Sequence, residues 1–167
     1  MKTFVYIDHF KGDVQPASWE ALGLAKSFGT AIALVFGTGA DDVAKAALEY
    51  GADEVLLADD SALTDYRAET YASTLSALAS SHSPNLVLLP TTARTREMAA
   101  MAAIDLNTGV LTDVSGLEAN GDSFVATRPI YEGKLIEKTV CSGKPVMATI
   151  RGRAFPKPNR EEGKGGT

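Results

Sequence analysis

Residues 85–106 decide the fold, and they read NLVLLPTTARTREMAAMAAIDL. The first part, Asn85–Pro90, is almost continuously apolar, which is typical of a parallel strand covered by helices on both faces. The second part, Arg94–Leu106, is rich in alanine and is long enough for about three helical turns. The stretch therefore predicts a strand that is followed at once by a helix.

Three more units of a strand and a helix precede this one. Their strands are short apolar runs, and their helices end at breakers such as Gly29, Gly51 and Pro84. We expect Asp41 to cap the second helix and Gly51 to end it in a left-handed conformation. The alternation predicts an α/β fold of three layers, in which helices flank a mainly parallel sheet. The predicted strands are Thr3–Asp8, Ala31–Phe36 and Glu54–Ala58, and the predicted helices are Ala17–Phe28, Asp41–Tyr50 and Ala68–His82.

The pattern changes after Gly109 to a β-rich carboxyl-terminal extension. Turns at Asn120-Gly121 and at Gly133 indicate hairpins, so we expect some of its strands to run antiparallel beside the parallel core. We assign residues 1–156 to a single α/β domain and residues 157–167, which lack an apolar anchor, to a linker or disordered tail. The strands predicted in the extension are Val110–Leu117, Ser123–Pro129, Leu135–Val140 and Val146–Ile150.

The composition excludes several classes of protein. A net charge of −5 over 167 residues argues against a nucleic-acid surface, because phosphates require clustered Lys and Arg. Cys141 is the single cysteine, and His9 and His82 are far apart, so we expect neither an internal disulfide nor a metal site of zinc type. No run approaches the roughly 20 apolar residues that cross a bilayer. We therefore expect no membrane insertion and a cytoplasmic location.

The polar segment after Asn85–Pro90 is a candidate cofactor-binding site. It follows the carboxyl end of a strand, where open α/β sheets commonly bind ligands, and its hydroxyl and guanidinium groups suit an anion. The alternative is that Thr92 or Thr95 caps the helix while the arginines are solvated or pair with acids. The candidates are Thr91, Thr92, Arg94 and Arg96.

The segment Gly37-Thr38-Gly39 also follows a strand and precedes a helix. Its glycines could let backbone N–H groups approach a phosphate. A dinucleotide fingerprint, however, would have Gly or Ala at the position of Asp42, whose carboxylate repels phosphate. We interpret the segment as a tight turn.

Two segments are candidate interfaces. Residues 127–134 gather a guanidinium, an aromatic ring and a carboxylate around a turn, a combination that is enriched at protein interfaces. Residues 151–156 place two arginines and an exposed phenylalanine at the end of the domain, which favours docking or, equally, a strand end that frays into a linker. No nucleophile is held beside a base, so we expect no catalytic residues and no enzyme. The interface candidates are Arg128, Tyr131, Arg151, Arg153 and Phe155.

Several segments together resemble the alpha subunits of electron-transfer flavoproteins. The resemblance covers nearly the whole chain, and the shared order and spacing of the segments carry it. The segments are Trp19 with Leu22–Gly29, Tyr50–Val55, Ala58–Asp60, Pro90–Thr92 with Arg96–Ala99, Thr112–Val114, Arg128–Lys134 and Arg153–Pro156.

The resemblance implies a bacterial, Rossmann-like domain of the adenine-nucleotide-hydrolase-like type, which packs against a beta subunit in a heterodimer. In this family FAD is held mainly by a following carboxyl-terminal domain, which is absent here, and the beta subunit usually holds AMP. We therefore expect no cofactor in this chain alone. The implied role is a non-flavin scaffold and docking domain of a protein that carries electrons from flavin dehydrogenases to a quinone-linked reductase or another acceptor.

A second hypothesis comes from a different class. A free-standing nucleotide-binding regulatory module, similar to universal stress proteins, would use the strand ends near Asp8, Gly37–Gly39 and Thr91–Arg96. A hydrolase-like enzyme is a more distant alternative, since a nucleophile with its base or a full phosphate loop is lacking.

Overall fold

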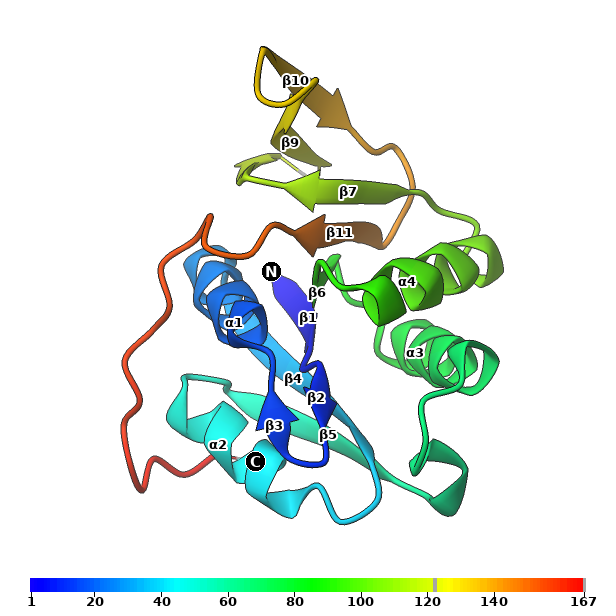
Figure 1. The fold of residues 1–167 in the computed structure, drawn as a ribbon, viewed down its shortest axis with the longest axis vertical. Coiled ribbons are helices and arrows are strands. Elements are labelled where there is room, and N and C mark those ends of the chain that lie inside the picture. The colour runs from blue at the N-terminus through cyan, green and yellow to red at the C-terminus, as the bar shows by residue number, and fades with distance from the viewer. Residues whose placement is uncertain (122, 167) are drawn as a thin grey trace.

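The protein is built around a parallel sheet, seen in a computed structural model that describes residues 1–121 and 123–166 (Figure 1). Six strands of these residues lie in the order β5-β4-β1-β6-β11-β7, and every neighbouring pair is parallel. The mainly parallel sheet predicted from the sequence is confirmed. The strands are β1 (Lys2–Tyr6), β4 (Thr30–Gly37), β5 (Glu54–Asp59), β6 (Leu86–Pro90), β7 (Val110–Val114) and β11 (Val146–Ile150).

Four α-helices of the described chain cover the two faces of this sheet. Figure 1 shows α1 and α2 on one side and α3 and α4 on the other, so the three-layer arrangement is confirmed. α1 begins with Pro16, whose fixed φ suits the first helical position. The helices are α1 (Pro16–Phe28), α2 (Asp41–Glu49), α3 (Ala68–His82) and α4 (Ala93–Asp105), and a short 3-10 helix, η1, spans Ser61–Leu63.

The start of α2 differs from the prediction. Ala40 is the N-cap residue and no side chain caps the helix, whereas Asp41 is already inside the first turn. There the carboxylates of Asp41 and Asp42 still stabilise the helix by facing the positive end of its dipole. The other end agrees with the sequence, because Gly51 has a positive φ of 106° just beyond the last turn.

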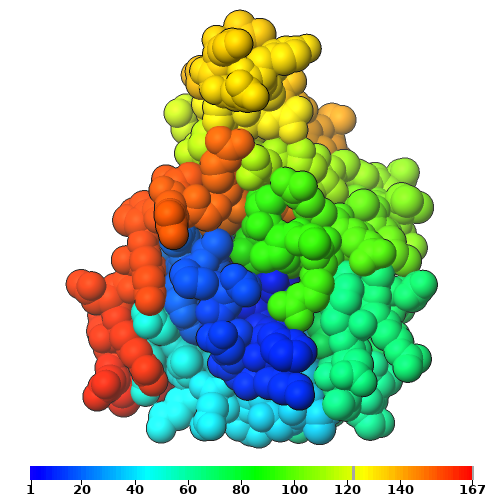
Figure 2. Space-filling model, viewed as in Figure 1, coloured from blue at the N-terminus to red at the C-terminus, as the bar shows by residue number. Residues whose placement is uncertain are grey.

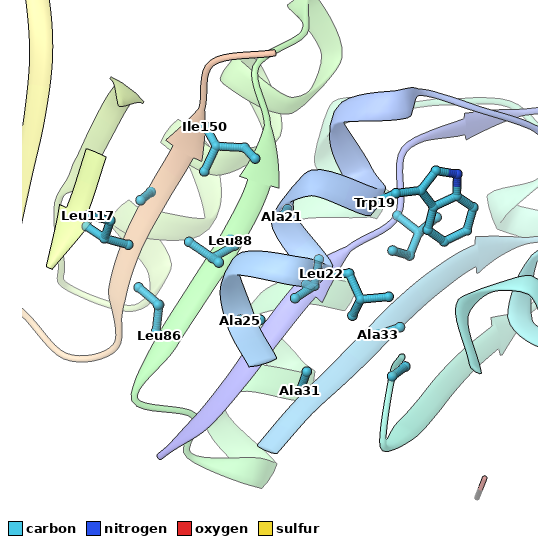
Figure 3. Close-up of a cluster of buried hydrophobic side chains, with 14 of the residues drawn as sticks. Trp19, Ala21, Leu22, Ala25, Ala31, Ala33, Leu86, Leu88, Leu117 and Ile150 are labelled. Carbon is cyan, nitrogen blue, oxygen red and sulfur yellow. The ribbon is translucent and has the colours of Figure 1, made fainter. Parts of the chain in front are cut away.

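Two apolar clusters fill the spaces on either side of the sheet. Alternate residues of one strand point to opposite clusters, so Leu86 and Leu88 face α1 while Val87 and Leu89 face α3 and α4. Small side chains on α1, including Ala21 and Ala25, lie over Ala31 and Ala33 and allow the helix to approach the sheet closely (Figure 3). The central strands β1, β4, β6 and β11 are almost entirely apolar because both of their faces are buried.

The β-rich extension departs from the predicted arrangement. Val146–Ile150 is not part of it, because β11 inserts into the parallel sheet between β6 and β7. The run predicted as Val110–Leu117 breaks at Ser115, and its end begins a separate antiparallel sheet of order β10-β9-β8. Antiparallel strands were thus predicted correctly, but they do not belong to the core sheet. Their bounds are β8 (Gly116–Asn120), β9 (Ser123–Ile130) and β10 (Leu135–Val140).

A small hairpin that the sequence did not reveal follows β1. It consists of β2 (His9–Phe10) and β3 (Asp13–Val14), which pair antiparallel and lie in front of the sheet in Figure 1. Each strand has two residues, which is too short for a periodic pattern.

Residues 157–166 contain no helix or strand, yet they contact the domain along α1 and α2 (Figure 2, red). The buried carboxylate of Glu49 accepts hydrogen bonds from Arg160 (2.7 Å) and from the N–H of Gly163 (3.2 Å). Pro158 crosses Gly23 so closely that a Cβ there would lie 3.0 Å from its ring. We call residues 157–166 the strap. Thr167 lies outside the described residues, and the assignment of residues 157–167 to a linker or disordered tail stays a prediction.

Removing the carboxylate of Glu49 should release the strap. We expect Glu49→Ala to speed tryptic cleavage after Arg160 and Lys164, whereas Glu69→Ala, on the exposed first turn of α3, should not. The bonds from Gly163 and Arg160 lower the pKa of Glu49, so its contribution is complete above the ordinary glutamate range and is lost as the pH falls through the lowered value. Limited proteolysis with trypsin near pH 8 compares the two variants, and protection of the Gly163 amide against hydrogen exchange, corrected for the intrinsic rate at each pH, follows the pH effect. Equal cleavage of the two variants would contradict the assignment.

Candidate functional site

The carboxyl ends of β1, β4 and β6 meet at one edge of the parallel sheet. Because β1 lies between β4 and β6, the chain reverses its direction of strand addition here, and such a point opens a crevice in which open α/β sheets bind ligands. The segments Asp8–His9, Gly37–Gly39 and Thr91–Arg96 follow these strands and are brought together at this edge.

Asp8 is the centre of this edge. Its carboxylate is buried, with Arg94 Nη2 2.8 Å from Oδ1, and Oδ2 accepts a hydrogen bond from the Thr92 hydroxyl (3.0 Å). Its backbone N–H donates to Ser18 Oγ on α1 (3.0 Å). Burial raises the pKa of Asp8, while Arg94 and then Thr92 act in the opposite direction. Asp8 thus joins the end of β1 to α4 through its carboxylate and to α1 through its backbone.

Of the two threonines of the candidate anion site, Thr92 caps α4, whereas the Thr91 hydroxyl is buried without a hydrogen-bond partner among the described residues. Thr92 is the N-cap residue, and its hydroxyl accepts a bond from Thr95 N (3.2 Å) while Thr95 Oγ1 accepts one from Thr92 N (2.9 Å). Thr91 donates its backbone N–H to Ile150. Arg94 pairs with Asp8 and Arg96 is exposed on the first turn. The segment therefore adopts the alternative arrangement, in which threonines cap the helix and Arg94 pairs with an acid. Of its two arginines, Arg96 is the one that stays exposed.

A cavity of about 750 Å³ lies beside this network, between the β2–β3 hairpin, the Gly37–Gly39 turn and the segment before α3. Its wall mixes aromatic, cationic and acidic side chains, among them Phe10, Lys11, Asp42, Asp65, Tyr66 and Arg94. The Arg94 charge is already compensated by Asp8, so two carboxylates face one uncompensated cation. This lining disfavours a polyphosphate.

The Gly37–Gly39 segment is a tight turn tied to its neighbours. The ring of His9 lies against Gly37, where a Cβ would come within 3.3 Å of it, and His9 Nε2 donates to Phe36 O (2.8 Å). Gly39 N–H donates to Asp59 (3.3 Å), so this amide faces a carboxylate rather than an open anion site. Burial lowers the pKa of His9, more than its bond to Phe36 raises it, and keeps the ring neutral.

Three of the interface candidates lie around β7 and the antiparallel sheet. Arg128 on β9 pairs with Glu137 on β10, and its Nη1 donates to the Thr112 hydroxyl (2.6 Å). Arg151 pairs with Asp113 (2.6 Å), whose φ of 55° is unusual for a residue other than glycine. Tyr131, at the tip of the β9–β10 hairpin, is 73% exposed. Three of the five candidates thus gather around the β-rich end.

Arg153 and Phe155 are placed elsewhere. Their backbone N–H groups donate to the two oxygens of Glu20 on α1, at 3.1 and 3.4 Å. Phe155 is half-buried against the core, so the expectation that its ring is exposed is wrong. The reason is that a buried glutamate, which the sequence did not single out, draws the chain back onto α1 after β11.

Two kinds of feature are not found among the described residues. In residues 1–121 and 123–166, no three His, Cys, Asp or Glu side chains are grouped so as to hold a metal ion. No helix in this part of the chain is long and apolar enough to cross a membrane.

Comparison with known proteins links the chain to electron transfer. A family model described as "Electron transfer flavoprotein domain" matches residues 3–167. Similar proteins include Protein FixB of Bradyrhizobium diazoefficiens, 35% identical over 167 residues, which cover 94% of this chain and 45% of that protein. The electron transfer flavoprotein subunit alpha of Syntrophomonas wolfei is 33% identical over 150 residues, or 89% of this chain and 47% of that subunit.

A third relative carries the name of an enzyme subunit. The lactate dehydrogenase (NAD(+),ferredoxin) subunit LctC of Acetobacterium woodii is 29% identical over 163 residues, which cover 93% of this chain and 39% of LctC. The chain thus spans less than half the length of these relatives.

Replacing Arg94 should destabilise the fold in a manner that depends on pH. Arg94→Met leaves the Asp8 carboxylate buried without its cation, so we expect a loss of about 1.5–3 kcal/mol in the free energy of unfolding at pH 8. The loss should shrink as the pH falls, because the folded pKa of Asp8 lies above its unfolded value and protonated Asp8 needs no cation.

The matched control is Arg151→Met, which breaks the more exposed pair with Asp113 and should cost no more than about 1 kcal/mol. Urea unfolding of both variants at several pH values provides the comparison. A deficit for Arg94→Met that grows on acidification would contradict this account.

Proposed function

The chain belongs to the electron transfer flavoprotein domain family, and we propose from this that it is the non-flavin scaffold and docking domain of an electron-transfer flavoprotein alpha subunit. The observation that carries the proposal is the family match over residues 3–167, together with coverage of 45% and 47% of two relatives. In the intact heterodimer the flavin would lie mostly in a second alpha-subunit domain, and AMP in the beta subunit. In that heterodimer this chain would be the scaffold against which the flavin-holding domain and the beta subunit are positioned.

The geometry of the carboxyl-terminal sheet edge supports a scaffold. Asp8, Arg94, Thr92 and Thr95 bond to one another and to the backbone, so these four side chains serve the fold. Two other buried polar atoms at this edge, His9 Nδ1 and Thr91 Oγ1, have no hydrogen-bond partner among the described residues. An isoalloxazine ring needs a cavity with a largely apolar wall and a few fixed polar groups. The wall of the cavity beside this network is mixed instead, because charges of both signs stand among its aromatic and apolar side chains.

The β-rich end supports docking. The antiparallel sheet projects from the body of the molecule (Figure 2, yellow), and its hairpin exposes Tyr131 at the tip. Arg128 and Tyr131 provide the guanidinium and the aromatic ring that anchor many protein interfaces. We propose that this end binds the beta subunit. The complete heterodimer would accept electrons from flavin dehydrogenases and pass them to a quinone-linked reductase or another acceptor.

Substitutions at this end should weaken assembly more than folding. We expect Arg128→Ala combined with Tyr131→Ala to weaken binding of the coexpressed beta subunit at least about tenfold, since buried interface arginines and tyrosines commonly contribute more than 1 kcal/mol each. Arg67→Ala, an exposed arginine before α3, is the control. Affinity is measured by titration and stability by thermal melting. Unaltered binding with both changes present would remove the interface assignment.

The cofactor content of the purified chain distinguishes the scaffold proposal from the alternative of a nucleotide-binding regulatory module. The 750 Å³ cavity at the strand ends is the observation that favours this alternative. We expect the purified chain to show no flavin absorbance and to release no flavin on denaturation. Calorimetry should give no stoichiometric binding of ATP or AMP, because Asp42 and Asp65 repel phosphates. Bound flavin would contradict the scaffold proposal, and tight nucleotide binding would favour a regulatory module.

A further inference from the structure

The cavity at the carboxyl-terminal edge of the parallel sheet is large enough for a small molecule. Its volume of about 750 Å³ lies within the range of roughly 300–1,000 Å³ that is usual for ligand pockets. Its wall comes from parts of the fold that are far apart in the sequence, namely the β2–β3 hairpin, the Gly37–Gly39 turn with the start of α2, residues 63–71 and Arg94. A molecule in this cavity would therefore contact several elements at once.

The charged groups of the wall favour a cation. Asp42 on the first turn of α2 and Asp65 before α3 are both exposed, and neither side chain makes a hydrogen bond or an ion pair with another described residue. Arg94 is compensated by Asp8, which lies 2.8 Å away. The described wall thus has two free carboxylates against the single ammonium group of Lys11.

A third acceptor belongs to His9, whose side chain also lines the cavity. Its Nε2 donates to Phe36 O (2.8 Å), and burial lowers the pKa of His9 and keeps the ring neutral, so Nδ1 is left as an acceptor. This Nδ1 is buried and has no hydrogen-bond partner among the described residues. An unpaired buried acceptor is costly, so a donor is favoured beside this ring.

Aromatic rings form much of the remaining wall. Phe10 on the hairpin is 63% exposed, while Tyr66 and Tyr71 pack edge to face with their ring centroids 5.0 Å apart. Lys11 Nζ lies 5.4 Å from the centroid of the Phe10 ring. Arg94 Cζ lies 5.9 Å from the centroid of the Tyr66 ring. Because the face of an aromatic ring attracts positive charge, the rings and the carboxylates favour the same kind of ligand.

Other occupants suit this wall less well. Asp42 and Asp65 repel an anion, and a neutral apolar molecule would leave the acceptors of the wall without donors. A metal ion is also disfavoured, because the described part of the chain groups no three His, Cys, Asp or Glu side chains that could hold one.

We propose that this cavity binds an organic cation through its guanidinium or ammonium group. The charged group lies next to the carboxylates of Asp42 and Asp65, and the apolar part of the molecule packs against the rings of Phe10 and Tyr66. The cation also competes with Lys11 for the Phe10 ring. The site lies away from the β-rich end, so it is independent of the proposed docking there (Figure 1).

Calorimetric titration of the purified chain with agmatine, which carries a guanidinium and an ammonium group, tests for the site. We expect saturable binding of one agmatine per chain and no binding of butylurea, a neutral analogue of similar shape. Acetylarginine amide serves as a probe for an arginine side chain of a partner protein. If it binds more tightly than agmatine, the cation belongs to a protein, and the reverse order assigns the site to a free amine. No saturable binding of either cation, or equal binding of butylurea, would overturn the proposal.

Substitutions separate a specific site from a general attraction of cations to an acidic chain. Asp42→Asn combined with Asp65→Asn should weaken agmatine binding at least about tenfold, because both free carboxylates are lost. The matched control combines Asp41→Asn with Glu69→Gln, which removes the same charge from the first turns of α2 and α3 outside the cavity wall and should change the affinity less than about twofold. Lys11→Ala should tighten binding, since it removes the competing cation.

Thermal melting shows whether each variant is folded, and all of the substituted side chains are exposed. Equal weakening by the two double variants would mean that only net charge attracts agmatine, and it would overturn the proposal. Weaker binding by the folded Lys11→Ala variant would also overturn it.

Discussion

The buried carboxylate of Asp8 is the constraint on which the carboxyl-terminal edge of the sheet depends. It follows the central strand β1 and is bound by Arg94 and Thr92 from α4, while its own backbone is held by Ser18 of α1. Helices from both faces are thereby fixed to one strand end. An uncompensated charge in this position would be costly, so the polar residues around it are committed to neutralising it. The same commitment explains why a crevice at the usual ligand position carries no spare cationic cluster.

The sequence was informative where structure is local. Continuous apolar runs identified β1, β4, β5 and β6, and alanine- and leucine-rich segments bounded by glycine and proline located the four helices within a few residues. The sequence was less informative where an element pairs with residues that are distant along the chain. The insertion of β11 between β6 and β7 depends on pairing across the chain, and no periodicity in Val146–Ile150 distinguishes a core strand from an edge strand.

The candidate site illustrates the same limit. That Thr92 caps α4 follows from its place before an alanine-rich run, and this alternative was visible in the sequence. That Arg94 pairs with Asp8 requires the strand order, since the two residues come from different units of the fold. Phe155 looked exposed because it precedes a polar tail, but Glu20 accepts bonds from the backbone N–H groups of Arg153 and Phe155, and the ring packs against the core. Contacts of this kind join residues that are far apart in the sequence, so no local pattern predicts them.

The strap has a mechanical consequence for any longer chain of this family. Ten freely moving residues would let a following segment wander over an end-to-end distance of roughly 16–19 Å. Because Glu49 fastens Arg160 and Gly163 to α2, that freedom begins near residue 166 instead of residue 156. The origin of the tether is displaced from the end of β11 to the opposite side of the domain, beside α2 (Figure 1). A segment attached there would be confined to a different and smaller volume. The hydrogen bonds of the Glu49 carboxylate would determine how far that segment can move from the domain.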